Sequence, residues 1–302
     1  MIFMNKSYIG SAMLVLTALI WGCAFVAQSI GMDYVGPFTF SAVRSILGAT
    51  ALVPCIFLFD YFNRKKNAPV GTWNKNVWQG GVVSGIFLGI ATNLQQIGLV
   101  YTSAGKAGFV TALYIVLVPI CGIFLQKKVA PSVWVSVVLA TGGLYLLCIN
   151  ESFSIGRGDI FVFLCAFAFA AQILAVDHYA PLVDGIRLAC VQFYVCGIVS
   201  LIGMLLWESP VLADILAAWK PICYTAFLST SVAYTLQIIA QKYTEPTIAS
   251  LLMSFESVFA TLAGFVILHE VLTARELMGC VIMFAAVILA QIPQKYFTRK
   301  RI

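Results

Sequence analysis

Charged side chains are scarce in this sequence: Asp, Glu, Lys and Arg account for 10% of its 302 residues, whereas hydrophobic residues account for 61%. A soluble domain averages about 25% charged and about 45–50% apolar residues. So few charges cannot cover the apolar surface of a protein dissolved in water. The composition therefore excludes an ordinary soluble globular protein and indicates an integral membrane protein whose surroundings are the lipid bilayer.

Residues suited to metal chemistry are scarce as well. Only two histidines occur, His178 and His269, and they are too few for a metal site. The nine cysteines lie singly inside apolar runs without a Cys-x-x-Cys motif, as is typical of small buried hydrophobes. We therefore expect no metal and no other cofactor.

Motifs for hydrolysis and for nucleotide binding are absent from the sequence. The chain has no His-Glu-x-x-His, no Gly-x-Ser-x-Gly and no Walker lysine motif. Its net charge of +6 comes from short clusters of cations between apolar runs. Such clusters suit loops beside an anionic membrane leaflet better than a nucleic-acid surface, so nucleic acid is not an expected partner.

Long apolar runs dominate what is present. A helix needs about 20 apolar residues to cross a bilayer core of about 30 Å. Ten runs approach or exceed this length, so we predict an all-α integral membrane protein with ten transmembrane helices. The predicted spans are Tyr8–Ile30, Phe38–Phe59, Val77–Val100, Ala107–Leu125, Pro131–Asn150, Asp159–Val176, Ile186–Trp207, Ile222–Gln241, Thr247–Leu268 and Leu277–Ile292.

The distribution of Lys and Arg between these spans sets an orientation. With the N-terminus inside, thirteen of these residues fall in inner segments and four in outer ones, namely Lys106, Arg157, Lys220 and Arg275. The positive-inside rule then places both termini in the cytoplasm. The expected location is the cytoplasmic membrane, which the chain crosses many times.

The chain looks like one unit written twice. The segments Ala91–Gly122 and Ala233–Gly264 share nine identities at an offset of 142 residues, among them the Tyr-Thr pairs that begin at Tyr101 and Tyr243. Apolar composition alone would not easily supply matched Tyr-Thr pairs. We therefore predict two repeated units, residues 1–150 and 151–302.

The first helices of the two units also align. They share Phe25 with Phe169 and Gln28 with Gln172, and Arg44 in the second helix lies opposite Gln192 in the seventh. Each unit contains five spans, and five is an odd number. The second unit must therefore be inverted relative to the first, and we expect a central cavity between them.

Two charged residues lie inside predicted spans, Arg44 in the second and Glu256 in the ninth. A charge near the bilayer centre costs at least about 2.5–3.5 kcal/mol on insertion scales, so each must face protein or water. Each is either a structural strut, satisfied by a salt bridge or a backbone carbonyl, or part of a functional site. In a functional site, Glu256 would bind a substrate amine or a proton. Tyr114 is a further candidate because it aligns with Glu256, and Ser254 because it lies nearby.

Amide side chains form a second set of candidates. Asn93 and Gln192 lie deep in their spans and are predicted to reach the cavity. Gln95 and Gln237 lie nearer helix ends and are predicted to hydrogen-bond between helices, a contact worth about 0.6 kcal/mol in membranes.

The aromatic residues Trp21 and Tyr234 are either packing residues or further contributors to the cavity. The repeat is best preserved in the third, fourth, eighth and ninth helices. We therefore predict that these four helices wall the cavity, with Tyr114 and Glu256 at related depths on opposite walls.

One set of residues matches the pattern of a known family: Trp21-Gly22 and Phe25 in the first span, Arg44 in the second, and Tyr-Thr-Ser-Ala-Gly-Lys-Ala-Gly-Phe from Tyr101, with Pro119, in the fourth. With these residues the chain resembles the EamA-type branch of the drug/metabolite transporter superfamily over nearly its whole length. The resemblance implies a ten-helix inverted-repeat carrier with a central cavity, often an exporter of amino acids or other small metabolites. One departure is Glu256-Ser257, where the family has Ser or Glu followed by Pro, so the resemblance gives no proline kink at this point.

The leading functional hypothesis is a secondary transporter that exports small metabolites such as amino acids by alternating access, driven by gradients rather than by ATP. Its expected partner is a small-molecule substrate, and a homo-oligomer is left open. An intramembrane lipid-modifying enzyme and a passive channel are the alternatives. A carrier of phosphate esters is less favoured because Arg44 is the one cation inside a span.

Overall fold

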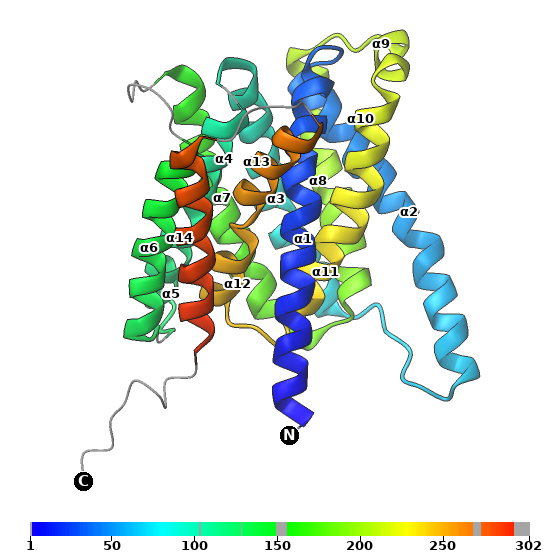
Figure 1. Ribbon diagram of the computed structural model, residues 1–302. Helices are drawn as coiled ribbons and strands as arrows, with labels where there is room; N and C mark the ends of the chain where they lie inside the picture. Colours follow the sequence, from blue (N-terminus) through cyan, green and yellow to red (C-terminus); the bar gives the residue numbers. More distant parts are fainter. Residues whose placement is uncertain (1, 103, 128, 149–155, 268–272, 293–302) are drawn as a thin grey trace.

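The computed structural model describes residues 2–102, 104–127, 129–148, 156–267 and 273–292, and the regular structure within these ranges is helical. Figure 1 shows the helices side by side in one bundle, with the beginning of α1 and the end of α14 at the same end. The helices of the first half are α1 (Ile2–Met32), α2 (Pro37–Lys65), α3 (Lys75–Tyr101), α4 (Ala104–Ala112), α5 (Tyr114–Phe124) and α6 (Pro131–Cys148). Those of the second half are α7 (Arg157–Tyr179), η1 (Ala180–Leu182), α8 (Gly185–Trp207), α9 (Leu212–Ala217), α10 (Trp219–Cys223), η2 (Tyr224–Ala233), α11 (Tyr234–Ala240), α12 (Pro246–Met253), α13 (Glu256–Ile267) and α14 (Ala274–Gln291).

The lengths of these helices confirm an all-α membrane protein. Within the described residues, nine helical segments are long and apolar enough to cross a membrane, and a tenth, Pro131–Leu147, is apolar but shorter. Large apolar side chains cover the outside of the bundle, as Phe57, Phe124 and Leu205 illustrate with 69%, 83% and 70% of their surface exposed. Such a surface is stable in lipid and not in water, so the chain is a multi-pass membrane protein.

Two of the predicted spans are interrupted rather than continuous. In the fourth span, α4 ends at Ala112 and α5 begins at Tyr114; in the ninth, α12 ends at Met253 and α13 begins at Glu256. The two restarts, Tyr114 and Glu256, occupy corresponding positions of the repeat, 142 residues apart. Each half of the chain therefore carries one broken helix, at the same place.

The break in the ninth span forms without a proline. The Ser254 hydroxyl donates to the carbonyl of Leu251 over 2.7 Å, and the N–H of Ser257 bonds to the carbonyl of Ser254 three residues back. These tighter turns replace part of the α-helical ladder between the two pieces. The ninth span is therefore interrupted even though no proline follows Glu256.

The packing of helices is the same in both halves. Helix α3 packs along α7, and in the corresponding arrangement η2 and α11 pack along α1. Helices α2 and α8, which correspond to one another, pack together, as do α6 and α14. Gly85 lets α3 and α8 approach closely, because a β-carbon there would lie 2.6 Å from the carbonyl oxygen of Gln192.

Acidic residues tie both ends of the α2–α8 pair. At one end Glu208, just after α8, accepts hydrogen bonds from the N–H groups of Phe38 and Thr39 at 2.9 and 2.8 Å and thereby caps α2. At the other end Asp60, in the last turns of α2, accepts from Nη2 of Arg187 at the start of α8 over 2.5 Å. Thr39 and Arg187 are 148 residues apart, as are Asp60 and Glu208, so the two ties correspond.

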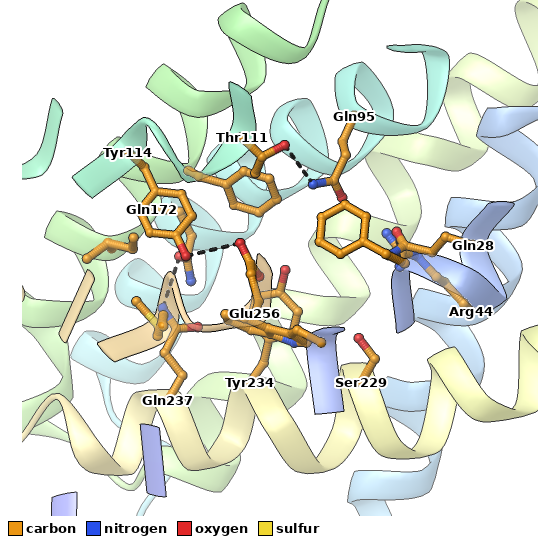
Figure 2. Close-up of a pocket in the computed structure, with 15 residues that line it drawn as sticks. Gln28, Arg44, Gln95, Thr111, Tyr114, Gln172, Ser229, Tyr234, Gln237 and Glu256 are labelled. Atoms are coloured by element: carbon orange, nitrogen blue, oxygen red, sulfur yellow. Dashed lines mark hydrogen bonds between the residues drawn. The ribbon is translucent and has the colours of Figure 1, made fainter. Parts of the chain in front are cut away.

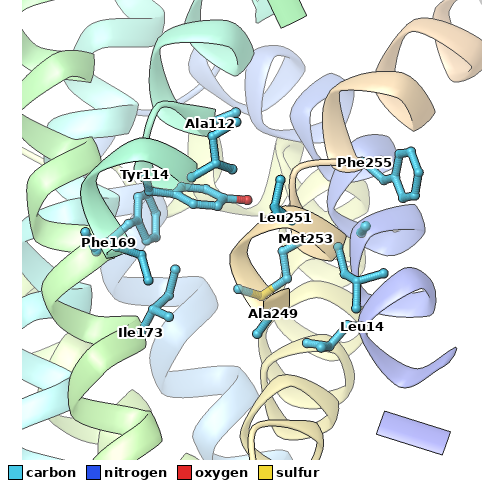
Figure 3. Close-up of a cluster of buried hydrophobic side chains, with 14 of the residues drawn as sticks. Leu14, Ala112, Tyr114, Phe169, Ile173, Ala249, Leu251, Met253 and Phe255 are labelled. Carbon is cyan, nitrogen blue, oxygen red and sulfur yellow. The ribbon is translucent and has the colours of Figure 1, made fainter. Parts of the chain in front are cut away.

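Buried apolar side chains from both halves meet around the broken helices. Figure 3 shows the ring of Tyr114 beside Phe169, with Leu251 and Met253 of the interrupted ninth span nearby. The ring centroids of Tyr114 and Phe169 are 6.5 Å apart in an edge-on arrangement. The apolar core therefore holds the two restart positions toward the middle of the molecule.

Candidate functional site

A small cavity lies between the two halves (Figure 2). Its walls are aromatic and polar. The lining residues are Trp21, Phe25, Gln28, Arg44, Gln95, Thr111, Tyr114, Phe169, Gln172, Ile173, Ser229, Tyr234, Gln237, Met253 and Glu256.

A hydrogen bond between Tyr114 and Glu256 joins the two halves across this cavity. The phenol of Tyr114 donates to Oε1 of Glu256 over 3.1 Å, and the two residues are 3% and 5% exposed. Each residue follows the tight turn that interrupts the α-helical hydrogen bonding of its span. The interface between two repeats is where secondary transporters hold their substrates and ions.

Arg44 is the cation of the cavity. Its Nη1 donates to Oε1 of Gln28 over 3.1 Å, and its guanidinium carbon lies 5.7 Å from the centroid of the Phe40 ring. Within the described residues, no carboxylate lies within ion-pairing distance of Arg44. Arg44 and Glu256 therefore line one cavity without forming a salt bridge.

The glutamines of the second half form a continuous chain of hydrogen bonds. Gln172 donates to Gln192 over 3.2 Å and accepts from Gln237 over 3.3 Å. Gln237 also donates to Gln241 over 3.0 Å, and Gln241 donates to the carbonyl of Ile173. In the first half, the equivalent of Gln237 is Gln95.

Gln95 makes a different contact from its counterpart. It donates to the hydroxyl of Thr111 over 3.2 Å, rather than to Gln28, so the described residues of the first half form no corresponding chain of glutamines. The one side-chain hydrogen bond described for Gln28 is the bond that it accepts from Arg44.

Two aromatic rings pack against Tyr234, which lies in the wall of the cavity. The centroids of Trp21 and Tyr234 are 4.5 Å apart, and those of Phe193 and Tyr234 are 5.1 Å apart. Trp21 Nε1 is buried and has no hydrogen-bond partner among the residues that the structure describes. The cavity therefore offers flat apolar surface together with a free donor.

Five of the eight predicted site residues line the cavity: Trp21, Arg44, Tyr114, Tyr234 and Glu256. The other three do not. Asn93 donates to Ser200 over 2.9 Å between α3 and α8. Gln192 accepts a hydrogen bond from Gln172, which itself lines the cavity. Ser254 bonds within the turn that separates α12 from α13.

Gln95 and Gln237 hydrogen-bond to residues of other helices, as predicted, and they also line the cavity. Asn93 and Gln192 do not line the cavity and instead hydrogen-bond between helices. Asn93 and Gln95 are separated by about 200° around a helix, so they point to opposite sides even though their depths are similar. Depth in a span does not report which way a side chain points.

The walls of the cavity also include helices that the prediction omitted. The first and sixth spans contribute Phe25, Gln28, Phe169 and Gln172, and the second contributes Arg44, in addition to the third, fourth, eighth and ninth. The signal for these positions was present, because Phe25 matches Phe169 and Gln28 matches Gln172 in the repeat. Shared polar and aromatic identities marked the cavity better than depth did.

Comparisons with known proteins agree with this architecture. Residues 8–149 and 156–291 each match the model of the EamA-like transporter family. An uncharacterized transporter of Archaeoglobus fulgidus is 33% identical over 280 residues, which cover 92% of this chain and 84% of that protein. The uncharacterized transporter YoaV of Bacillus subtilis is 23% identical over 273 residues, or 88% of this chain and 90% of that one.

A crystal structure of another protein has the same fold. It superposes with a TM-score of 0.77 at 16% sequence identity, covering 96% of this chain and 99% of the other. The two family matches together span nearly the whole sequence and divide it where the two five-span halves meet. This chain belongs to the EamA-like transporter family and is a membrane transporter.

Proposed function

We propose that this protein is a secondary transporter that exports small metabolites, such as amino acids, across the cytoplasmic membrane by alternating access. The observation that carries the proposal is the hydrogen bond between Tyr114 and Glu256, which joins the broken helices of the two halves inside a central cavity. We take residues 1–150 and 151–302 as the two units that rock against each other, with both termini in the cytoplasm.

Alternating access requires that the two units separate first at one face and then at the other. Tyr114 belongs to the first unit and Glu256 to the second, so their bond is exposed to any such movement. Because the bond lies at the restart of both broken helices, a change in it alters the positions of both. This supports a role for the pair in coupling the movement to what the cavity holds.

Glu256 is suited to exchange a proton or to bind an amine. An ionised carboxylate away from water is costly unless a cation is near, and Arg44 does not form an ion pair with it. Its described partner is the Tyr114 hydroxyl, which can bond to either protonation state by reversing its role. Water or a cationic substrate entering the cavity then favours the charged form.

The test is the variant Glu256→Gln in proteoliposomes. The amide imitates the protonated acid, so we expect a folded protein that still exchanges bound substrate in counterflow but loses pH-dependent net transport. Tyr114→Phe is the matched control, since it removes the same hydrogen bond but keeps the carboxyl group. Wild-type net flux and pH profile in a stably folded Glu256→Gln protein would refute a role for Glu256 in coupling or substrate contact.

The same assay separates the alternatives. A carrier gives saturable flux that substrate on the opposite side accelerates, whereas a passive channel gives neither saturation at low concentration nor such acceleration. A lipid-modifying enzyme would change the lipids of the vesicle without moving the labelled solute. Flux without trans-acceleration would therefore overturn the alternating-access proposal.

The proposed orientation is tested by labelling. Single cysteines at Lys66, Arg157 and Lys220 are introduced after the native cysteines have been replaced. Impermeant reagent should label the Arg157 and Lys220 positions from outside intact cells and the Lys66 position only after lysis. A label on position 157 from the cytoplasmic side alone would contradict the inverted arrangement.

A further inference from the structure

The two halves of the chain contain the same helix contact, made by different side chains. In the second half, Gln172 of α7 donates to Oε1 of Gln192 on α8 over 3.2 Å. In the first half, Arg44 of α2 donates to Oε1 of Gln28 on α1 over 3.1 Å. Gln28 corresponds to Gln172 and Arg44 to Gln192, so one half uses an amide where the other uses a guanidinium.

The second half indicates that this contact does not need a charge. Gln192 makes it as a neutral side chain that is fully buried. Arg44 instead brings a cation to a position that is 5% exposed, where burying a charge is costly. In the described part of the chain no carboxylate pairs with it. The hydrogen bond to Gln28 therefore does not account for the presence of an arginine.

Arg44 lines the cavity and carries more N–H donors than its described hydrogen bond uses. A guanidinium carries five N–H donors, and the bond to Gln28 is the one described for Arg44. The buried Nε1 of Trp21, in the same cavity, has no acceptor in the described part of the chain. Figure 2 places Arg44 and Gln28 on the side of the cavity away from Tyr114, with Glu256 between. Unused donors in one cavity fit a ligand that supplies acceptor oxygens.

Resting on the transport function proposed above, we infer that Arg44, oriented by Gln28, binds a carboxylate group of the substrate. The planar guanidinium can make two parallel hydrogen bonds to a carboxylate. One buried cation matches one such group, whereas a doubly charged phosphate ester would keep an uncompensated charge in the cavity. The substrate class is a small monocarboxylate, and Glu256 is the acceptor for a cationic amine on the same molecule.

The inference is tested with matched ligands that differ in one group. Leucine is compared with 3-methylbutylamine, which lacks the carboxylate, and with 4-methylpentanoate, which lacks the amine. Phenylalanine, 2-phenylethylamine and 3-phenylpropanoate form the same series with a larger side chain. Binding to the purified full-length protein is measured from its melting temperature and its tryptophan fluorescence. We expect the amino acid of at least one series to bind most tightly and the amine to bind most weakly.

The decisive variant is Arg44→Gln, because Gln192 shows that an amide can hold the same contact. It should fold and weaken the binding of the carboxylate-bearing ligands about tenfold to a hundredfold. Binding of the amine should change by less than about threefold, since an amine does not use the guanidinium. Arg44→Lys keeps the charge without the planar fork and should bind carboxylates with intermediate affinity, which gives a second measurement if Arg44→Gln does not fold.

Equal binding of the three members of each series, binding of the amines alone, or no binding of any carboxylate would overturn the inference. Unchanged affinities in a folded Arg44→Gln protein would do so as well. These outcomes do not depend on flux. Carboxylates that bind through Arg44 but show no counterflow would refute the transport proposal and leave the Arg44 subsite standing. Counterflow of amines that is unchanged in Arg44→Gln would support transport and refute the Arg44 subsite.

Discussion

Gln172, in the second half of the chain, bonds to Gln192 on one side and Gln237 on the other, whereas its counterpart Gln28 in the first half bonds to Arg44. The counterpart of Gln237, which is Gln95, turns to Thr111 instead. The helices around these residues pack in the same way in both halves. The backbone of the repeat has therefore kept its symmetry, while the polar side chains at the cavity have diverged.

This difference separates structural residues from functional ones within a single molecule. Where both halves carry the same type of contact, as at the two ends of the α2–α8 pair, a structural role explains both copies. At some corresponding positions, one half carries a buried charged residue and the other a neutral one. A structural role explains the neutral residue but not the charge. Arg44 and Gln192 are such a pair, and so are Glu256 and Tyr114.

Placing an arginine at position 192, which corresponds to Arg44 in the first half, should destabilise the protein more than any other change considered. Gln192 is fully buried between helices and lies outside the cavity, so the cation in Gln192→Arg would have neither water nor a carboxylate partner. We expect a destabilisation of at least about 3 kcal/mol, seen as loss of monodisperse protein in detergent. Arg44→Gln is the reciprocal control and should remain folded. Equal yields of the two variants would show that the two positions are equivalent after all.

Removing the acid at one end of the α2–α8 pair should have the next largest effect. The Arg187 side chain is 4% exposed and lies 2.5 Å from Asp60, with Asp184 at 3.5 Å as its second partner. Asp60→Asn leaves a buried cation with the weaker partner alone, and we expect a loss of about 2–3 kcal/mol in thermal unfolding. An unchanged melting temperature would mean that Asp184 suffices.

The corresponding change at the other end should be milder. Glu208→Gln keeps an oxygen that can accept from the N–H groups of α2 and loses the charge that favours a helix N-terminus. We expect a loss of about 0.5–1 kcal/mol in the same unfolding measurement. A larger loss than for Asp60→Asn would reverse the order that burial of Arg187 predicts.

The smallest effects should come from the amides. Gln237 makes two side-chain hydrogen bonds and Gln95 makes one, each worth about 0.6 kcal/mol in a membrane protein. Gln237→Ala should therefore destabilise the fold about twice as much as Gln95→Ala. Similar melting temperatures for both variants would indicate that the glutamine chain of the second half adds nothing beyond single bonds.

The sequence was sufficient to predict the spans, the repeat and the alignment of Tyr114 with Glu256. Span length and apolar content are properties of a local window, and the offset of 142 residues can be counted directly. The rotation of each helix is not local, because it depends on which neighbour the helix meets. Asn93 was therefore wrongly predicted to reach the cavity, since it bonds to Ser200 on another helix, and the sequence did not reveal that Gln95 also lines the cavity.

The helix breaks were also beyond the reach of sequence. Neither Ser254 nor Leu113 is a residue that ends helices strongly, and both interrupted spans read as continuous apolar runs. The turn at Ser254 depends on a hydroxyl that reaches back to Leu251, which is one conformation among several open to a serine. The repeat offers the one clue, because the two breaks coincide once the halves are aligned.

The paired acids at the ends of α2 and α8 constrain how this molecule can move. A helix pair fastened at both faces cannot widen at one face while it narrows at the other unless one fastening gives way. In the alternating access proposed above, α2 and α8 would stay together as the axis, and the remaining helices of each half would turn about them.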